Sequence, residues 1–231
     1  MTRPSSVPSF THVPRGHPDN ANASFSADQA PGTPDEKTMQ EGIALFLQGA
    51  GVDRTDPNLA DTPRRVVRAW VDEFLCGYQM VPAEILQARF PAPGDGPVIV
   101  TNLKFVSVCP HHLLPYSGMA HVAYVPEDGV VGLSQLSRLI ACHSRRLILQ
   151  ETLTLQVADS LMVHLGARGA ACVFTSRQAC MALRGVREDE HQCVTSIFLG
   201  AFEQDRSLQQ LFIKALPPLE APLPEPGAKG A

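Results

Sequence analysis

The order in which strand-like and helix-like hydrophobic patterns follow one another is the feature that most constrains this fold. Four segments have the β-branched composition of strands, at residues 98–108, 119–125, 170–176 and 193–199. Between the second and third of them, apolar residues recur at helical spacing over 133–147 and 149–165. Two strands, two helices and two strands predict an α+β fold, in which an antiparallel sheet carries paired helices on one face.

A helical segment is predicted ahead of this sheet. Apolar residues at helical spacing over 39–47 stop at Gly49. A second helix opens at Thr62, which can cap it, with Pro63 at the first helical position. Gly77 can end that helix.

Proline-rich ends mark the limits of the folded unit. Residues 1–34 hold six prolines among polar residues without periodicity, which predicts a disordered N-terminal arm. The segment 217–231 is also rich in proline and predicts an extended, flexible tail. One catalytic domain over 35–216 remains.

Charge and composition exclude several classes of protein. The net charge is −4 and no long run of Lys or Arg occurs, which argues against a nucleic-acid partner. No apolar stretch approaches the roughly 20 residues that span a bilayer, and the N-terminus lacks a secretory pattern. Six scattered cysteines then fit thiols or metal ligands better than disulfides. We therefore expect a cytoplasmic protein without a membrane partner.

The densest chemical cluster is the segment Cys109-Pro110-His111-His112, which follows the first strand; Cys180 lies 68 positions after His112. Thiolate and imidazole are preferred ligands of zinc, and Cys109, His112 and Cys180 could form a three-ligand site with one position open to water. The alternative is that these residues only pack or face solvent. A structural site with a fourth ligand also stays open, and the candidates for it are Cys172, Cys193 and His191.

Other polar residues have both a structural and a functional interpretation. Glu151 lies near a predicted helix start, where a carboxylate is favourable in itself, but a carboxylate can also accept two hydrogen bonds from guanine. Four arginines on separate segments could clamp phosphates or simply face solvent: Arg65, Arg68, Arg138 and Arg184.

Taken together, these segments resemble the GTP cyclohydrolase I family over about residues 36–216. The matching stretches are Asp61-Thr62-Pro63-Arg64-Arg65, Cys109-Pro110-His111-His112-Leu113, Val131-Gly132-Leu133-Ser134, Leu149-Gln150-Glu151-Thr152-Leu153, Arg184-Gly185-Val186 and Val194-Thr195-Ser196. The resemblance implies the tunnelling fold, or T-fold, assembled as a homodecamer with active sites between subunits. It also implies hydrolysis of GTP to 7,8-dihydroneopterin triphosphate and formate.

The resemblance further assigns roles to individual residues. It makes Cys109, His112 and Cys180 the ligands of Zn²⁺, His111 the catalytic proton-transfer residue and Glu151 the guanine anchor. The remaining substrate-binding positions that it implies are Gln150, Ser134, Gln135, Arg138, Arg184, Arg65 and Arg68.

The sequence departs from the family's pattern at three positions. Pro110 replaces the usual glutamate of the Cys-Glu-His-His motif, and Gln135 stands in place of a lysine that would contact phosphate. Gln178, two residues before Cys180, occupies the position of a second active-site histidine. Glutamine forms hydrogen bonds but does not shuttle protons near neutral pH, although His191 or a bound water could compensate.

Two rival interpretations follow. The first is a paralogue that acts on another guanine derivative or stops at the formamide intermediate, which Gln135 and Gln178 favour. The second is a non-catalytic, zinc-stabilised oligomeric scaffold. The presence of His111 beside an open three-ligand site argues against this second interpretation.

Overall fold

A computed structural model of the chain describes residues 32–53, 55–92 and 94–218. The chain divides into the units Met1–Pro31 and Gly32–Ala231, and every described element belongs to the second unit. The predicted disordered arm at 1–34 and the flexible tail at 217–231 lie almost wholly outside the described residues. No helix among the described residues is long and apolar enough to cross a membrane.

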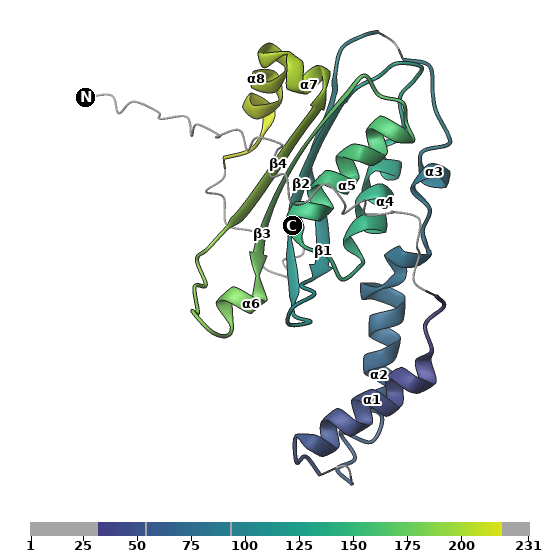
Figure 1. The fold of residues 1–231 in the computed structure, drawn as a ribbon, viewed down its shortest axis with the longest axis vertical. Helices are drawn as coiled ribbons and strands as arrows, with labels where there is room; N and C mark the ends of the chain where they lie inside the picture. The colour runs from purple at the N-terminus through teal and green to yellow at the C-terminus, as the bar shows by residue number, and fades with distance from the viewer. Residues whose placement is uncertain (1–31, 54, 93, 219–231) are drawn as a thin grey trace, which may run out of the picture. The chain divides into compact units, whose positions relative to one another are not determined.

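Four antiparallel strands form one sheet in the order β1-β2-β3-β4 (Figure 1). The strands are β1 (Val98–Val108), β2 (Pro115–Val125), β3 (Gly169–Gln178) and β4 (Cys193–Gly200). The pairing of β1 with β2 shifts register between Val100 and Leu103, where Asn102 takes a φ of 62°. Each strand lies where the β-branched composition predicts it, although β2 begins four residues earlier than expected.

Two helices cover one face of the sheet, as the sequence predicts (Figure 1). They are α4 (Leu133–Ser144) and α5 (Gln150–Val163). Leu139 of α4 and Leu161 of α5 are fully buried in the same apolar cluster as Phe174 of β3. Leu147, which the periodicity assigned to the first helix, lies in the connection between the two helices and forms a bridge with Val108 of β1.

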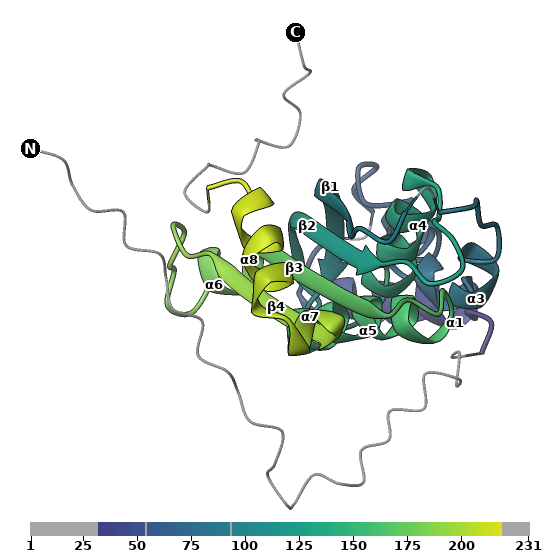
Figure 2. The ribbon, with the colours of Figure 1, turned by 90° about the horizontal axis from the view of Figure 1, so that it is seen from above.

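The opposite face carries two helices that the sequence analysis did not predict. They are α7 (Ala201–Gln204) and α8 (Arg206–Ala215), and Figure 2 shows them on the other side of the sheet from α4. Phe202 and Phe212 are fully buried against Ala171 and Val173 of β3. The sheet is therefore covered on both faces.

The helical segment ahead of the sheet is also present. It consists of α1 (Glu36–Gly49), α2 (Thr62–Ala69), a π-helical turn at Trp70–Phe74, a 3-10 turn at Cys76–Gln79 and α3 (Pro82–Ile85). Asp35 caps α1 by accepting hydrogen bonds from the backbone of Lys37 and Thr38 at 3.1 and 3.2 Å. The last short helix, α6 (Ala179–Ala182), follows β3 directly.

Candidate metal centre and surrounding site

The candidate site begins in the tight connection between β1 and β2. The backbone N–H of Cys109 donates to the carbonyl of Leu114 at 2.9 Å, and that of Leu113 donates to Cys109 at the same distance. Leu113 takes a φ of 54°, which is uncommon for a residue with a branched side chain. This closed loop presents Cys109 and His112 from the end of the sheet.

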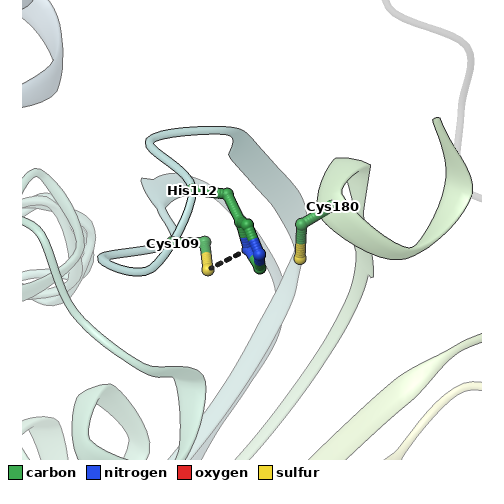
Figure 3. A group of neighbouring side chains, drawn as sticks. All are labelled: Cys109, His112 and Cys180. Carbon is green, nitrogen blue, oxygen red and sulfur yellow. Dashed lines mark hydrogen bonds between the residues drawn. The ribbon is translucent and has the colours of Figure 1, made fainter. Parts of the chain in front are cut away.

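The sheet register brings Cys180 to the same place. Tyr116 at the start of β2 pairs with Gln178 at the end of β3, and α6 then carries Cys180 toward the loop. Figure 3 shows the side chains of Cys109, His112 and Cys180 converging from two separate segments. One ligand atom from each of the three lies within 4.8 Å of the others.

This donor set suits a zinc ion. Zn–S and Zn–N bonds of about 2.3 and 2.0 Å place tetrahedral ligand atoms roughly 3.5 to 3.8 Å apart. The Sγ of Cys109 and Nδ1 of His112 are 3.8 Å apart, and both cysteines are free thiols. Cys109 is buried, whereas His112 is exposed and Cys180 is half-buried. The metal group is therefore shielded from solvent at Cys109 and accessible to solvent at His112.

Burial and nearby charges shift the pKa values of residues in and around the metal group. Burial raises the pKa of the Cys180 thiol, and the neighbouring Cys109 raises it further. Burial also raises the pKa of Tyr116, whose hydroxyl donates to the carbonyl of Ile148 at 2.9 Å. The negative charge of Glu151 adds to the rise for Tyr116, which places this carboxylate in the electrostatic neighbourhood of the site.

Two further predicted residues, His111 and Glu151, are exposed. The ring of His111 lies edge-on to that of His112, with ring centroids 6.2 Å apart. Glu151 is in the first turn of α5, but it provides no side-chain cap to that helix. Within the described part of the chain, neither side chain makes a hydrogen bond or an ion pair. Both are therefore open to a ligand, and the interpretation of Glu151 as a helix cap has no support in its contacts.

Gln150 has the opposite environment, although it precedes Glu151 directly. Its amide nitrogen donates to the carbonyls of Phe174 and Cys193 and to the hydroxyl of Thr195, at 3.0, 3.2 and 3.1 Å. Its amide oxygen accepts a hydrogen bond from Ser176. Gln150 is 1% exposed, so it connects α5 to the sheet rather than facing a ligand.

Gln135 is likewise directed into the protein. Its amide oxygen accepts from the backbone N–H of Gly132 at 2.7 Å and so caps α4. Its amide nitrogen donates to the carbonyls of Ile85 and Ala88 at 2.7 and 2.9 Å. A contact with phosphate would have to break these bonds, because both amide donors are already used.

Four further substrate-binding candidates lie on two helices. Ser134 and Arg138 are exposed and share one face of α4. Arg65 and Arg68 are exposed on α2, where they pair with Asp61 at 3.0 Å and Asp72 at 3.4 Å. In the described structure, no hydrogen bond or ion pair joins these four residues to the metal group.

Arg184 is the one predicted arginine that contacts the metal group. It follows α6, and its Nη1 lies 2.7 Å from Nε2 of His112. This contact joins the loop after α6 to the loop after β1, 72 positions apart in the sequence. The sequence motif placed Arg184 near phosphate but gave no signal of a partner on His112.

Gln178 lies beside Cys180, and its backbone is held by His191. The backbone N–H of Gln178 donates to Nε2 of His191 at 3.1 Å, and Nδ1 of His191 hydrogen-bonds the carbonyl of Glu188. Both ring nitrogens of His191 are thus occupied by backbone groups. His191 accordingly anchors the end of β3 and does not replace the missing histidine as a free acid or base.

The other candidates for a fourth metal ligand lie outside the group. Cys172 is fully buried in the core, and burial raises its pKa. Cys193 is half-buried, and its pKa is raised by burial and by the charge of Glu151. Cys193 therefore lies near the site, but the group of neighbouring ligand atoms in the described residues is Cys109, His112 and Cys180.

Comparison with known proteins identifies relatives of the chain. The family model for GTP cyclohydrolase I matches residues 39–216. GTP cyclohydrolase 1 of Bifidobacterium longum strain DJO10A is 42% identical over 176 residues, which cover 76% of this chain and 88% of the relative. GTP cyclohydrolase 1 of Wolinella succinogenes is 39% identical over 176 residues, or 76% and 94% of the two chains. The solved structure of the archaeosine synthase QueF-Like in the apo form aligns with 47% of this chain and 97% of its own, at 16% identity and a TM-score of 0.39.

Proposed function

The chain belongs to the GTP cyclohydrolase I family of hydrolases, and we propose that it is a zinc-dependent enzyme that converts GTP to 7,8-dihydroneopterin triphosphate and formate. The observation that carries the proposal is the convergence of ligand atoms from Cys109, His112 and Cys180 within 4.8 Å of one another. A zinc ion held there would supply Lewis-acid chemistry and an acidified water through its open position.

The exposed carboxylate of Glu151 supports the role of guanine anchor. It lies in the first turn of α5, and it has no competing hydrogen-bond partner in the described chain. The N1–H and the exocyclic amine of guanine are two parallel donors that one carboxylate accepts. This contact would orient the imidazole ring of the purine toward the metal group.

His111 supplies the proton transfer in this proposal. Ring opening at C8 and release of formate consume two water molecules, and closure of the new ring releases one, so each GTP consumes one water overall. Protons must pass between water, the purine nitrogens and the departing formate. In this proposal the exposed ring of His111, which lies next to His112, accepts and returns these protons.

The triphosphate would be bound by Ser134, Arg138 and Arg184, with Arg65 and Arg68 added from a neighbouring subunit. Among the described residues, the last two have no hydrogen bond or ion pair to the metal group, and they pair with acidic residues of their own segment. We extend the proposal to a homodecamer with sites between subunits, as the family resemblance implies. Gln135 and Gln150 take structural rather than substrate-binding roles in this account.

The catalytic unit is proposed to span residues 35–216 and to work in the cytoplasm. The family match at 39–216 lies inside these limits. All six cysteines are free thiols in the structure, and the metal group requires thiolates. A reducing compartment keeps the cysteines from forming disulfides, so their thiolates stay available to the metal.

Gln178 favours one alternative activity. Its side chain is a carboxamide next to Cys180, where the family pattern has an imidazole, and His191 does not take over that role. An enzyme that lacks the second proton shuttle could release the formamide intermediate or act on another guanine derivative.

Incubation of the metal-loaded protein with GTP, followed by identification of the products, distinguishes these activities. The proposal expects equal amounts of formate and a dihydropterin triphosphate. A formamide product that accumulates without pterin supports the alternative activity. Unchanged GTP, with zinc bound and the protein folded, contradicts both the full reaction and release of the formamide, and leaves another guanine derivative as the substrate to test.

A further inference from the structure

The ends of β3 and β4 carry side chains that face the N-terminus of α5. The hydroxyls of Ser176 and Thr195 both hydrogen-bond the side-chain amide of Gln150, so these two positions lie on the α5 side of the sheet. Because side chains alternate along a strand, Gln178 and Cys193, each two residues further toward the strand end, face the same side. The register pairs Ser176 with Cys193, which makes Cys193 and Gln178 diagonal neighbours.

Cys193 and Gln178 join the region of Glu151 to the region of Cys180. The Nε2 of Gln150 donates to the carbonyl of Cys193 at 3.2 Å, so Cys193 lies beneath the residue that directly precedes Glu151. The Oε1 of Gln178 lies 4.0 Å from the Sγ of Cys180. Cys193 and Gln178 therefore form part of the sheet surface between the proposed guanine anchor and the metal group.

The charges around Cys193 favour an uncharged ligand. Burial raises the pKa of the Cys193 thiol, the negative charge of Glu151 raises it further, and a hydrogen bond from the side chain of Gln178 opposes part of the rise. The thiol is therefore neutral near pH 7. A neutral cysteine behaves as a small hydrophobic side chain, which suits the ring of a purine base, whereas the nearby carboxylate would repel a phosphate.

We propose that Cys193 is a substrate-contacting residue, whose thiol packs against the purine base of the substrate between Glu151 and the metal group. This inference rests on the proposed function, because it takes Glu151 as the guanine anchor. A base that is held by Glu151 and directed toward the metal group lies over the surface that Cys193 and Gln178 form. Binding of the base therefore covers the half-buried thiol.

Protection of this thiol from alkylation tests the contact without relying on product formation. Zinc-loaded protein is treated with iodoacetamide alone, with guanosine or with inorganic phosphate, and peptide mass spectrometry gives the rate of modification at each cysteine. Guanosine carries the base without phosphate. Cys76 is the matched control, because its thiol is also half-buried but belongs to the 3-10 turn Cys76–Gln79 of the helical segment.

Guanosine should protect Cys193 selectively. At ten times its dissociation constant, guanosine leaves about one site in eleven free, so modification of Cys193 should slow roughly tenfold. Modification of Cys76 should not change, and phosphate should leave Cys193 as reactive as in the free protein. An unchanged rate at Cys193 with guanosine bound overturns the inference, and so does equal protection by phosphate.

Equilibrium dialysis with guanosine separates this failure from a failure of the proposed function. It measures binding of guanosine to the same zinc-loaded protein, independently of any cysteine. If the folded protein binds no guanosine, the guanine site of the proposed function is itself wrong, and the inference about Cys193 is wrong with it. If guanosine binds and Cys193 is not protected, only the inference is wrong.

Substitutions at position 193 test whether the contact is direct. Cys193→Leu adds bulk where the base would lie, whereas Cys193→Ser keeps the size of the side chain. Guanosine affinity should fall roughly fivefold to a hundredfold in Cys193→Leu, the range expected for overfilling a packed site, and change little in Cys193→Ser. Zinc content at the wild-type level shows that each variant keeps its metal group. Unchanged guanosine affinity in zinc-loaded Cys193→Leu contradicts the contact, and if that variant does not fold, the alkylation of the wild type decides alone.

Discussion

Polar side chains gather in two regions of this protein, and the contrast between their environments separates structural from functional roles. Between α5 and the sheet, the amide of Gln150 has four hydrogen-bond partners and almost no exposure to solvent. At the sheet end beside it, His111 and Glu151 are exposed and have no partner of this kind in the described chain. Substitution of a buried, hydrogen-bonded side chain should mainly lower stability. Substitution of an exposed side chain without a partner should mainly lower substrate binding and turnover.

The neighbours Gln150 and Glu151 give the strongest test of this contrast. Glu151→Gln replaces a carboxylate that accepts two bonds with an amide that directs a donor at a donor. At about 1.5–3 kcal/mol for each charge-assisted bond, kcat/KM for GTP should fall roughly 10²- to 10⁴-fold. Steady-state kinetics, with the exposed Glu84→Gln as control, measures the loss. If Glu151→Gln instead left kcat/KM nearly unchanged and made the protein less stable, the carboxylate would only stabilise the N-terminus of α5.

Gln150→Leu should have the opposite signature. It leaves the buried hydroxyl of Ser176 without its acceptor and removes the three bonds donated by the amide. We expect the free energy of unfolding to fall by about 2–4 kcal/mol, measured by urea denaturation of metal-loaded protein. The exposed Gln87→Leu serves as control. Equal stability of the two variants would contradict a structural role for Gln150.

The buried His143 predicts that the stability of the protein depends on pH. Its ring hydrogen-bonds Gln156 and Ser160 at 3.2 and 2.8 Å, and burial, followed by the charges of Arg146 and His164, lowers its pKa from 6.5 to about 3. Below pH 6.5 the imidazole of His143 binds a proton in the unfolded chain but stays neutral in the folded chain. The free energy of unfolding therefore falls as the pH falls toward 3.

The expected loss through His143 is about 1.4 kcal/mol per pH unit in that window. Urea midpoints of the wild type should therefore fall more steeply between about pH 6.5 and 5 than those of His143→Gln. Parallel slopes for the two proteins would mean that His143 takes up its proton over the same pH range in the folded and the unfolded chain.

The smallest effect concerns Gln178, the residue at the boundary of the two regions. Its backbone is held by His191, but its side chain lies beside the thiol of Cys180. Gln178→His should raise the rate of dihydroneopterin triphosphate formation and reduce any formamide, because it restores a proton shuttle. Product analysis over time measures both. If Gln178→His is no faster with GTP, while the wild type readily converts another purine, Gln178 would instead determine which purine the enzyme accepts.

Much of the fold could be predicted because periodicity reports which side of an element is buried. The limits of β1 match the predicted residues 98–108, and β3 and β4 each start within one residue of expectation. The helices α7 and α8 were missed, although Leu208 and Phe212 have helical spacing and Asp205 caps α8. Their proximity to the proline-rich tail obscured this signal.

The site was predictable in its composition but not in the direction of its side chains. Ligand types and motif spacing select Cys109, His112 and Cys180, and the structure brings them together. The inward orientation of Gln135 depends on carbonyls 47 and 50 positions away, which no local pattern encodes. The contact of Arg184 with His112 depends in the same way on the distant pairing of strands.

The metal content of the purified protein tests the central claim most directly. Zinc per subunit is measured in the wild type, in Cys180→Ala and in Cys193→Ala, whose half-buried thiol lies outside the ligand group. The account predicts about one zinc per subunit in the wild type and in Cys193→Ala, and a large loss in folded Cys180→Ala. Undiminished zinc in Cys180→Ala, or a loss only in Cys193→Ala, would contradict it.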